Sequence, residues 1–127
     1  MKKIILLTSL LMCCLVQLSA ETAFSNPVAD PAAVVTSGRA RFTVLTPEMI
    51  RIQYSSSAKF EDRATFAVVN RRLPVPAYTV REEDNYLYIE TAKLTLRYKK
   101  NSIISPQYQK PDNLCITMKV GAHNVIW

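Results

Sequence analysis

Glycine and histidine are both scarce in this sequence of 127 residues. Gly38 and Gly121 are the only glycines, His123 is the only histidine, and there are three cysteines. A phosphate-binding loop of the P-loop or dinucleotide type needs several glycines close together, so both types are excluded. This supply of histidine and cysteine excludes a zinc finger, and no H-E-x-x-H pattern is present. We therefore expect no cofactor and no metal site.

The composition is otherwise that of a folded protein, with 49% hydrophobic and 9% aromatic residues. A disordered chain would carry fewer of both. The sequence has 16 Lys and Arg against 10 Asp and Glu, a net charge of +6. The basic residues are interspersed with acids, as in residues 59–63 and 81–84, and form only short pairs such as Arg71-Arg72. Nucleic-acid binding requires a clustered basic stripe, so no nucleic-acid partner is expected.

The first twenty residues have the layout of a secretory signal peptide. Lys2 and Lys3 precede an apolar run over residues 4–18, and the small residues Ser19 and Ala20 follow. This order of charged, apolar and small residues predicts cleavage after Ala20. The protein is then exported, to the periplasm or the extracellular space.

Two alternatives to a cleaved signal remain open. A transmembrane anchor needs about 18 to 20 apolar residues, and this run is shorter. A lipoprotein signal would use Cys13 or Cys14, but Met12 stands where a lipid-attachment motif has a small residue. We therefore favour a cleaved signal with no membrane span after its removal.

Residues 21–127 form the remaining domain. Removal of residues 1–20 takes away Lys2 and Lys3 but no acid, so 107 residues with a net charge of +4 remain. Cys115 is then the single cysteine and has no partner for an internal disulfide. A chain of this size buries about 60 to 68% of its unfolded surface, which is enough for one small domain.

Apolar residues alternate with polar residues along most of this domain, and a period of two is typical of half-buried strands. No helical period extends beyond two turns. Pro47 and the acidic residues 82–85 mark turns, and residues 106–111 and 121–124 are expected to be a loop and a turn. These signals predict an all-β antiparallel β-sandwich. Its expected strands lie at residues 39–44, 50–55, 65–69, 78–80, 86–90, 94–98, 114–120 and 125–127.

Six segments of the chain are informative in combination: NPVADP (26–31), RFTVLTPEMIR (41–51), KFEDRA (59–64), VNR (69–71), LPVP (73–76) and LTLRYKKN (94–101). Through them, residues 26–127 resemble the opening of secreted bacterial glycoside hydrolase family 31 enzymes. The similarity implies an N-terminal β-sandwich of the galactose-mutarotase-like kind, preceding a (β/α)8 catalytic barrel. Such enzymes are retaining α-glycosidases, such as α-glucosidases or α-xylosidases, that act on α-linked oligosaccharides.

The chain departs from that family in lacking the catalytic part. The family's nucleophile and acid/base are aspartates on the barrel, one within a Trp-x-Asp-Met-Asn-Glu-like motif that this sequence does not contain. A barrel needs about 250 residues. The loop at residues 107–113 is also longer and more polar than the family pattern. The resemblance therefore assigns no catalytic residue, and the barrel is expected as an intramolecular partner.

The last residues, 125–127, are apolar and strand-like, with no polar tail. A natural terminus tends to leave its last residues solvated. We therefore expect this sequence to be the beginning of a longer protein, although a terminal strand within the sheet is an alternative. A cut at this point leaves an open strand edge and an apolar patch, which favour self-association.

Two groups of neighbouring carboxylates in the chain could in principle supply a catalytic pair. Glu61-Asp62 and the cluster at residues 82–84 are the candidates by proximity. Neighbouring strand residues point to opposite faces, and the second cluster is expected in an exposed turn, so we interpret both as solvated acids. His123, in the turn at 121–124, lacks a nucleophile at a suitable spacing and is expected at the surface.

Cys115 and the aromatic residues have two interpretations each. Cys115 lies either on the outer face of its strand or against a second sheet, and we expect it to act as a small hydrophobic residue. The aromatic residues can stack on sugar rings, but their alternation favours packing. They are Tyr54, Tyr78, Tyr86, Tyr88, Tyr98 and Trp127.

Two functions follow from these observations. The first is an N-terminal accessory β-sandwich of an exported retaining α-glycosidase, inactive without its barrel. The second is a stand-alone exported β-sandwich that binds glycan or protein and has no enzymatic activity. The continuation of the gene beyond the codon for Trp127 distinguishes them.

Export with loss of residues 1–20 is the first testable prediction. When the gene is expressed in a secreting bacterial host, we expect the recovered protein to begin at Glu21, because signal peptidase cleaves after small residues such as Ala20. Intact-mass measurement of the exported protein checks this. A recovered protein that begins at Met1 would contradict the prediction.

Overall fold

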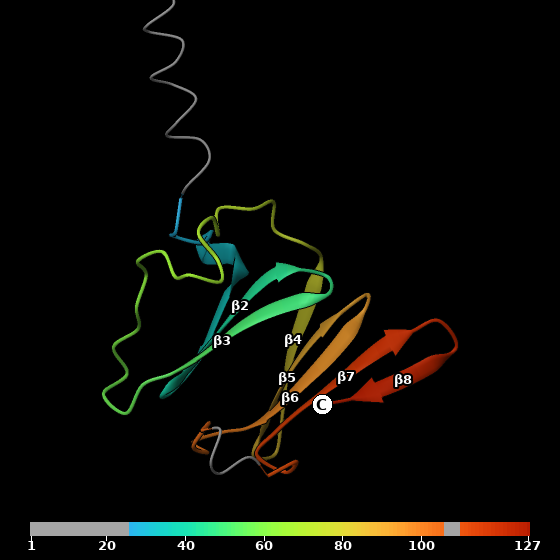
Figure 1. Cartoon of the computed structure of the whole chain (residues 1–127). Coiled ribbons are helices and arrows are strands. Elements are labelled where there is room, and N and C mark those ends of the chain that lie inside the picture. Colours follow the sequence, from blue (N-terminus) through green and yellow to red (C-terminus); the bar gives the residue numbers. More distant parts are fainter. Residues whose placement is uncertain (1–25, 106–109) are drawn as a thin grey trace, which may run out of the picture. The chain divides into compact units, whose positions relative to one another are not determined.

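The computed structural model describes residues 26–105 and 110–127, and their regular structure is almost entirely strand (Figure 1). The predicted signal peptide, residues 1–20, lies outside the described residues, as do residues 106–109 of the predicted loop. The elements are the 3-10 helix η1 (Pro31–Ala33) and the strands β1 (Val34–Ser37), β2 (Ala40–Thr46), β3 (Met49–Tyr54), β4 (Tyr78–Glu83), β5 (Tyr86–Thr91), β6 (Leu94–Lys99), β7 (Leu114–Val120) and β8 (His123–Ile126).

The strands form two antiparallel sheets. One sheet has the order β1-β2-β3, and the other has the order β4-β5-β6-β7-β8. Within each sheet every strand pairs with its neighbours in the sequence. Two longer connections interrupt the hairpins, residues 55–77 between the sheets and residues 100–113 between β6 and β7. The positive φ angles of Gly38 and Gly121 fit the turns that follow β1 and β7, where a side chain would be strained. The predicted all-β antiparallel β-sandwich is confirmed.

The core lies between the facing sides of the two sheets. The aromatic rings of Phe42 and Tyr98 meet across it, with centroids 5.2 Å apart. Alternate residues of β2, β5 and β6 complete the cluster, as the period of two in the sequence predicts. Its buried members are Ala40, Phe42, Val44, Leu87, Ile89, Leu94, Leu96 and Tyr98.

Strand β2 is more deeply buried than the alternation predicts. Thr43 belongs to the opposite face from Phe42, and Leu45 lies at the irregularity between Val44 and Thr46, yet both are also buried. Successive residues of a strand point to opposite faces, so both faces of β2 are shielded from solvent. A strand covered on two sides is more hydrophobic than a half-exposed one, and the apolar Leu45 accords with this position.

Two side-chain hydrogen bonds connect the sheets near their ends. The Tyr78 hydroxyl in β4 donates to the carbonyl oxygen of Ala32 at 2.6 Å, just before β1. The Thr91 hydroxyl in β5 donates to the carbonyl oxygen of Pro47 at 2.5 Å, in the turn between β2 and β3. Together with the core, they fix how β1–β3 lie against the first strands of the larger sheet.

Four sequence-based assignments were wrong. The turn expected at residues 82–85 is shorter, because Glu82 and Glu83 belong to β4. Residues 65–69 do not form a strand, and Phe66 is fully exposed, because this short apolar run has no neighbouring strand to pair with. Strand β1 was not predicted, since Val34–Ser37 is short and shows little alternation. The turn before β8 is only two residues long, Gly121-Ala122, so His123 begins the strand instead of lying in the turn.

The described chain divides into two compact units. Residues 26–28 and 62–72 belong to the smaller unit, and residues 29–61 and 73–127 to the larger, which contains both sheets. Each unit therefore has its own internal contacts. The sandwich described above is a property of the larger unit.

A buried arginine organises the smaller unit. The Arg71 guanidinium donates to the backbone carbonyl oxygens of Pro27, Asp62 and Arg63 at 2.9, 3.2 and 2.9 Å, and to the Thr65 hydroxyl at 3.3 Å. Only 2% of Arg71 is exposed. A segment without strand pairing must satisfy its backbone carbonyls in another way, and here one side chain supplies the donors.

The buried phenol of Tyr98 makes stability sensitive to alkaline pH. Burial raises the pKa of Tyr98 above its ordinary value of 10.0, Tyr54 raises it further, and Arg39 lowers it. The unfolded chain ionises Tyr98 near pH 10 while the folded chain keeps the proton. The contribution of Tyr98 is therefore fully present below about pH 10 and decreases as the pH rises further.

We expect the melting temperature to fall between about pH 9 and about pH 11, and to fall less steeply in the variant Tyr98→Phe. The variant loses the hydrogen bond from the Tyr98 hydroxyl to the Ser102 carbonyl oxygen, 2.8 Å long, which lowers stability by about 1 kcal/mol near neutral pH. Thermal melts of both proteins across this range check the prediction. Equal slopes would show that Tyr98 does not carry the effect.

Candidate functional site

The carboxylates at positions 61 and 62 lie on an exposed loop after β3. The loop contacts the sheet through the backbone carbonyl of Glu61, which accepts hydrogen bonds from three side chains of β2 and β3. These donors are Arg41 Nη2, Arg51 Nη2 and Gln53 Nε2, at 3.1, 3.2 and 3.0 Å. These three hydrogen bonds hold the loop against the sheet. The carboxylates of Glu61 and Asp62 remain exposed to solvent.

The second acidic cluster is divided between a strand and a turn. Glu82 and Glu83 end β4, and Asp84 occupies the following turn with a φ of 51°. Glu82 pairs with Lys100 at 2.8 Å, whereas Glu83 pairs with Arg81 at 2.5 Å. Because Glu82 and Glu83 are consecutive in a strand, their side chains leave opposite faces of the sheet.

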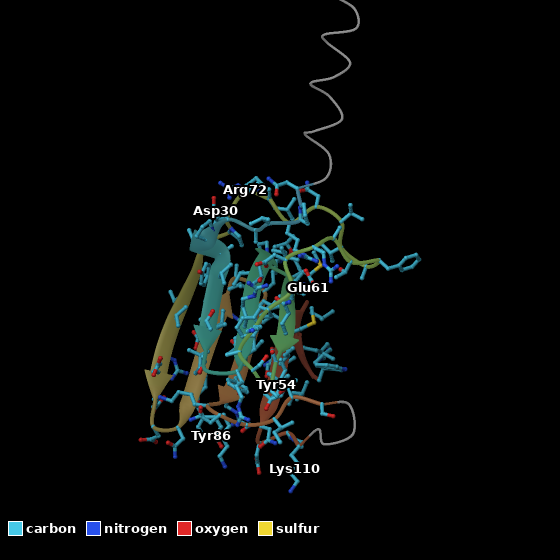
Figure 2. The ribbon with its side chains drawn as sticks, turned by 90° about the vertical axis from the view of Figure 1, so that its left-hand side faces the viewer. Asp30, Tyr54, Glu61, Arg72, Tyr86 and Lys110 are labelled. Atoms are coloured by element: carbon cyan, nitrogen blue, oxygen red, sulfur yellow. The ribbon has the colours of Figure 1, made fainter. Side chains whose placement is uncertain are left out.

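Neither acidic group has the arrangement of a retaining glycosidase. Such an enzyme needs two carboxyl groups about 5 to 5.5 Å apart that face one sugar, with the pKa of one raised. Glu82 and Glu83 face apart, and each pairs with a different cation. Figure 2 shows Glu61 far from Tyr86, the second residue after Asp84, so the two clusters do not form one site.

His123 and Cys115 lie on the two last strands of the larger sheet. His123 is exposed at the start of β8, opposite Val120. Cys115 is a free, half-buried cysteine in β7, and its register partner Arg97 places it on the outer face, one of the two positions expected for it. Within residues 26–105 and 110–127, no group of three His, Cys, Asp or Glu side chains is placed to hold a metal ion.

The chemically richest surface is the outer face of the larger sheet, and we call it the tyrosine–arginine face. Its members come from three neighbouring strands, β4, β5 and β6. The antiparallel register places Tyr88 directly between Arg81 and Arg97. The face consists of Arg81, Tyr86, Tyr88, Glu90 and Arg97.

Cation–π contacts and ion pairs order this face. The Arg81 guanidinium carbon lies 3.7 Å from the Tyr88 ring centroid, and that of Arg97 lies 5.2 Å from the Tyr86 centroid. The two tyrosine rings are 6.3 Å apart and inclined at 50°. Arg81 Nε also contacts Glu90 Oε1 at 3.1 Å. The five side chains therefore form one connected network on the sheet.

Electrostatics keep Arg81 charged within this network. Partial desolvation acts to lower the pKa of Arg81, but hydrogen bonds and charge attraction from Glu90 and Glu83 outweigh it and raise that pKa. The guanidinium covers the Tyr88 ring, so the rings do not form an open aromatic platform. What the face offers is a flat surface of ring edges, guanidinium donors and carboxylate acceptors, suited to binding and not to acid–base catalysis.

The other predicted aromatic residues have different roles. Tyr98 is in the core, and Tyr78 donates its hydrogen bond to Ala32, so packing explains both, as the alternation favoured. The Arg39 guanidinium carbon lies 5.9 Å from the Tyr54 ring centroid. Trp127, in contrast, is 66% exposed. Sequence reasoning missed Arg81 and Arg97, because only the strand register reveals that they lie over tyrosines.

An open cavity of about 270 Å³ lies beside the last strands. Its walls are mostly apolar, and Lys110 is its single charged lining residue. With no carboxylate in its lining, the cavity has no acid–base pair. The lining residues are Lys110, Pro111, Leu114, Cys115, Ile126 and Trp127.

In the part of the chain that the structure describes, no helix has the length and apolar character needed to cross a membrane. A comparison with known protein families finds no match to this chain, and a search of curated proteins finds none either.

The separated carboxylates predict that this chain does not hydrolyse glycosides. We expect the exported protein to cleave nitrophenyl α-glucoside and α-xyloside no faster than buffer, because Glu61 and Asp62 lie on an exposed loop and Glu82 and Glu83 face apart. Release of nitrophenol over several hours checks this. Turnover above the buffer rate that is abolished by Glu61→Gln or Asp62→Asn would overturn the prediction.

Proposed function

We propose that this chain is the N-terminal accessory β-sandwich of an exported retaining α-glycosidase, similar to the galactose-mutarotase-like domains that precede a (β/α)8 barrel. The observation that carries the proposal is an antiparallel β-sandwich over the residues that resemble family 31 enzymes, in which the two acidic clusters of the described chain do not form a catalytic carboxylate pair. Such a domain contributes packing and not chemistry. The α-linked oligosaccharide is the substrate of the whole enzyme, in the periplasm or outside the cell.

The tyrosine–arginine face is the surface that we assign to contact with the barrel. Tyrosine and arginine are enriched in protein interfaces, where they combine apolar area with hydrogen-bonding capacity. On this face the ion pairs of Arg81 with Glu83 and Glu90 hold the side chains in place before contact. A pre-ordered surface loses less side-chain entropy when a partner binds.

Glycan binding by a stand-alone module is the second candidate, and the same face favours it. Tyr86 and Tyr88 lie side by side on β5, and Glu90 and Arg97 flank them with hydrogen-bonding groups. The guanidinium and carboxylate groups of this face can pair with sugar hydroxyls, and the edges of the two tyrosine rings add apolar contact. In this function no barrel is needed.

The gene beyond the codon for Trp127 tests the first proposal. We expect an open reading frame of several hundred codons with the alternating strand and helix pattern of a (β/α)8 barrel, because the carboxylates of a retaining enzyme must come from there. Sequencing of the genomic locus checks this. A stop codon directly after Trp127 would refute the accessory-domain proposal.

In the longer enzyme, the double variant Tyr88→Ala with Arg81→Ala should lower the melting temperature of the whole protein and leave the aspartate chemistry in place. Thr79→Ala, on the same face of β4 but outside the network, is the matched control. Binding of maltooligosaccharides by this chain, measured by calorimetry and lost in Tyr88→Ala, would favour the glycan-binding module instead.

A further inference from the structure

The inner face of the larger sheet continues beyond the core. In β7 and β8 the register pairs Met118 with Val125 and Val120 with His123, so these residues belong to the core side of the sheet. Trp127 joins this side through a pair of 2.8 Å backbone hydrogen bonds with Ile116. Ile116 and Met118 are half-buried against the core, which makes this surface continuous with the sheet-to-sheet packing.

This part of the inner face is apolar and uncovered. Val120, Val125 and Trp127 are 55%, 51% and 66% exposed. The cause is the difference in strand number, because three strands in one sheet face five in the other. In Figure 1, β7 and β8 extend beyond β2 and β3. The smaller sheet is therefore two strands short of covering the larger one.

The edges of the two sheets differ in their protection. Strand β4 carries Arg81, Glu82 and Glu83 and follows Pro74 and Pro76, which are features that block pairing with another chain. The other outer edge, β1, is only four residues long.

Strand β8 has no such protection. Its residues His123–Ile126 include no Lys, Arg, Asp, Glu or Pro, and all four are exposed. An uncharged, exposed edge beside an apolar face is suited to pairing with a further strand. The edge and the face together define one interaction surface.

We propose that this surface binds a second copy of the same chain through a two-fold axis, with β8 of each copy alongside β3 of the other. The numbers of strands in the two sheets support a second copy of the chain as the binding partner. Three strands of one copy and five of the other make a sheet of eight, and the second sheet is the same by symmetry. The two strands that the smaller sheet lacks are then supplied by β8 and β7 of the other copy.

In this arrangement the uncovered faces of the two copies close on each other. Val120, Val125 and Trp127 of one copy pack against the same residues of the other, as an isologous interface requires. The outer edges β8 and β3 become interior, and the edges that remain are β1 and β4. The dimer thus buries the apolar surface and leaves the protected edges exposed.

The proposal does not rest on the proposed function. If the polypeptide of a longer protein covers the same face, the longer protein is monomeric and the chain of 127 residues is still a dimer. A monomeric chain overturns the dimer and leaves the accessory-domain proposal unaffected. The two proposals therefore fail in distinguishable ways.

The test is the molar mass of the exported protein in solution, measured by size-exclusion chromatography with light scattering and by sedimentation over a range of concentrations. We expect a reversible dimer. Val125→Lys should weaken dimerisation at least about tenfold, because it places a charge in the apolar interface. Thr117→Lys is the matched control, since it adds the same charge on the outer face of β7, which is not an edge strand, and should leave the dimer intact.

Circular dichroism of the two variants ensures that they are compared as folded proteins. Should Val125→Lys not fold, Val120→Thr provides a milder change on the same face. A monomer at all concentrations overturns the proposal, and so does an association that Val125→Lys and Thr117→Lys weaken equally.

The geometry is tested by crosslinking in a Cys115→Ser background. Gln53→Cys in one copy and Asn124→Cys in the other place thiols on β3 and β8, on the same side of the joined sheet. A short bismaleimide should link the mixed pair. Linkage of Asn124→Cys to itself, without the mixed product, would indicate pairing of β8 with β8 and overturn the arrangement.

Discussion

The packing of the two sheets against each other is the interaction on which the fold depends. Cys115 is free in the described chain, so the larger unit has no internal disulfide and relies on burial of apolar side chains. The contact between Phe42 and Tyr98 lies in that packing, and removal of a buried aromatic ring from such a core typically costs about 3 to 5 kcal/mol. This is a large fraction of the stability of a small domain. The surfaces of the sheet, including the tyrosine–arginine face, are held in place by this core.

The fold class was predictable because alternation depends on local sequence alone. Residues 94, 96 and 98 alternate with polar neighbours, and in the structure all three are buried. The run at residues 65–69 has similar composition but no partner strand, so strand propensity was overridden by its surroundings. There the determining interaction is the Arg71 guanidinium with distant carbonyl groups, which no local pattern encodes. Long-range pairing, and not propensity, decides the two cases.

The candidate site was less predictable than the fold, since it depends on register. Tyr88 lies between Arg81 and Arg97 only because β5 pairs with β4 and β6 in one particular alignment. A shift by one residue would move these side chains to the opposite face. The acidic residues show the converse: Glu82 and Glu83 are adjacent in sequence and separated in space, as the alternation of strand side chains requires. Proximity in sequence is thus a poor guide to a shared site in a β protein.

The pattern of β7 contains one further constraint. Its alternation of Leu114, Ile116, Met118 and Val120 is as regular as that of β6, whose inward residues are fully buried. In β7 burial decreases along the strand until Val120 is more than half exposed. An apolar position that faced solvent would gain nothing from remaining apolar, so the regular pattern is accounted for when this end of the strand is also covered. The three-stranded sheet does not reach this end of β7. In the proposed dimer, β7 and β8 of the second copy cover it without any rearrangement of the existing core.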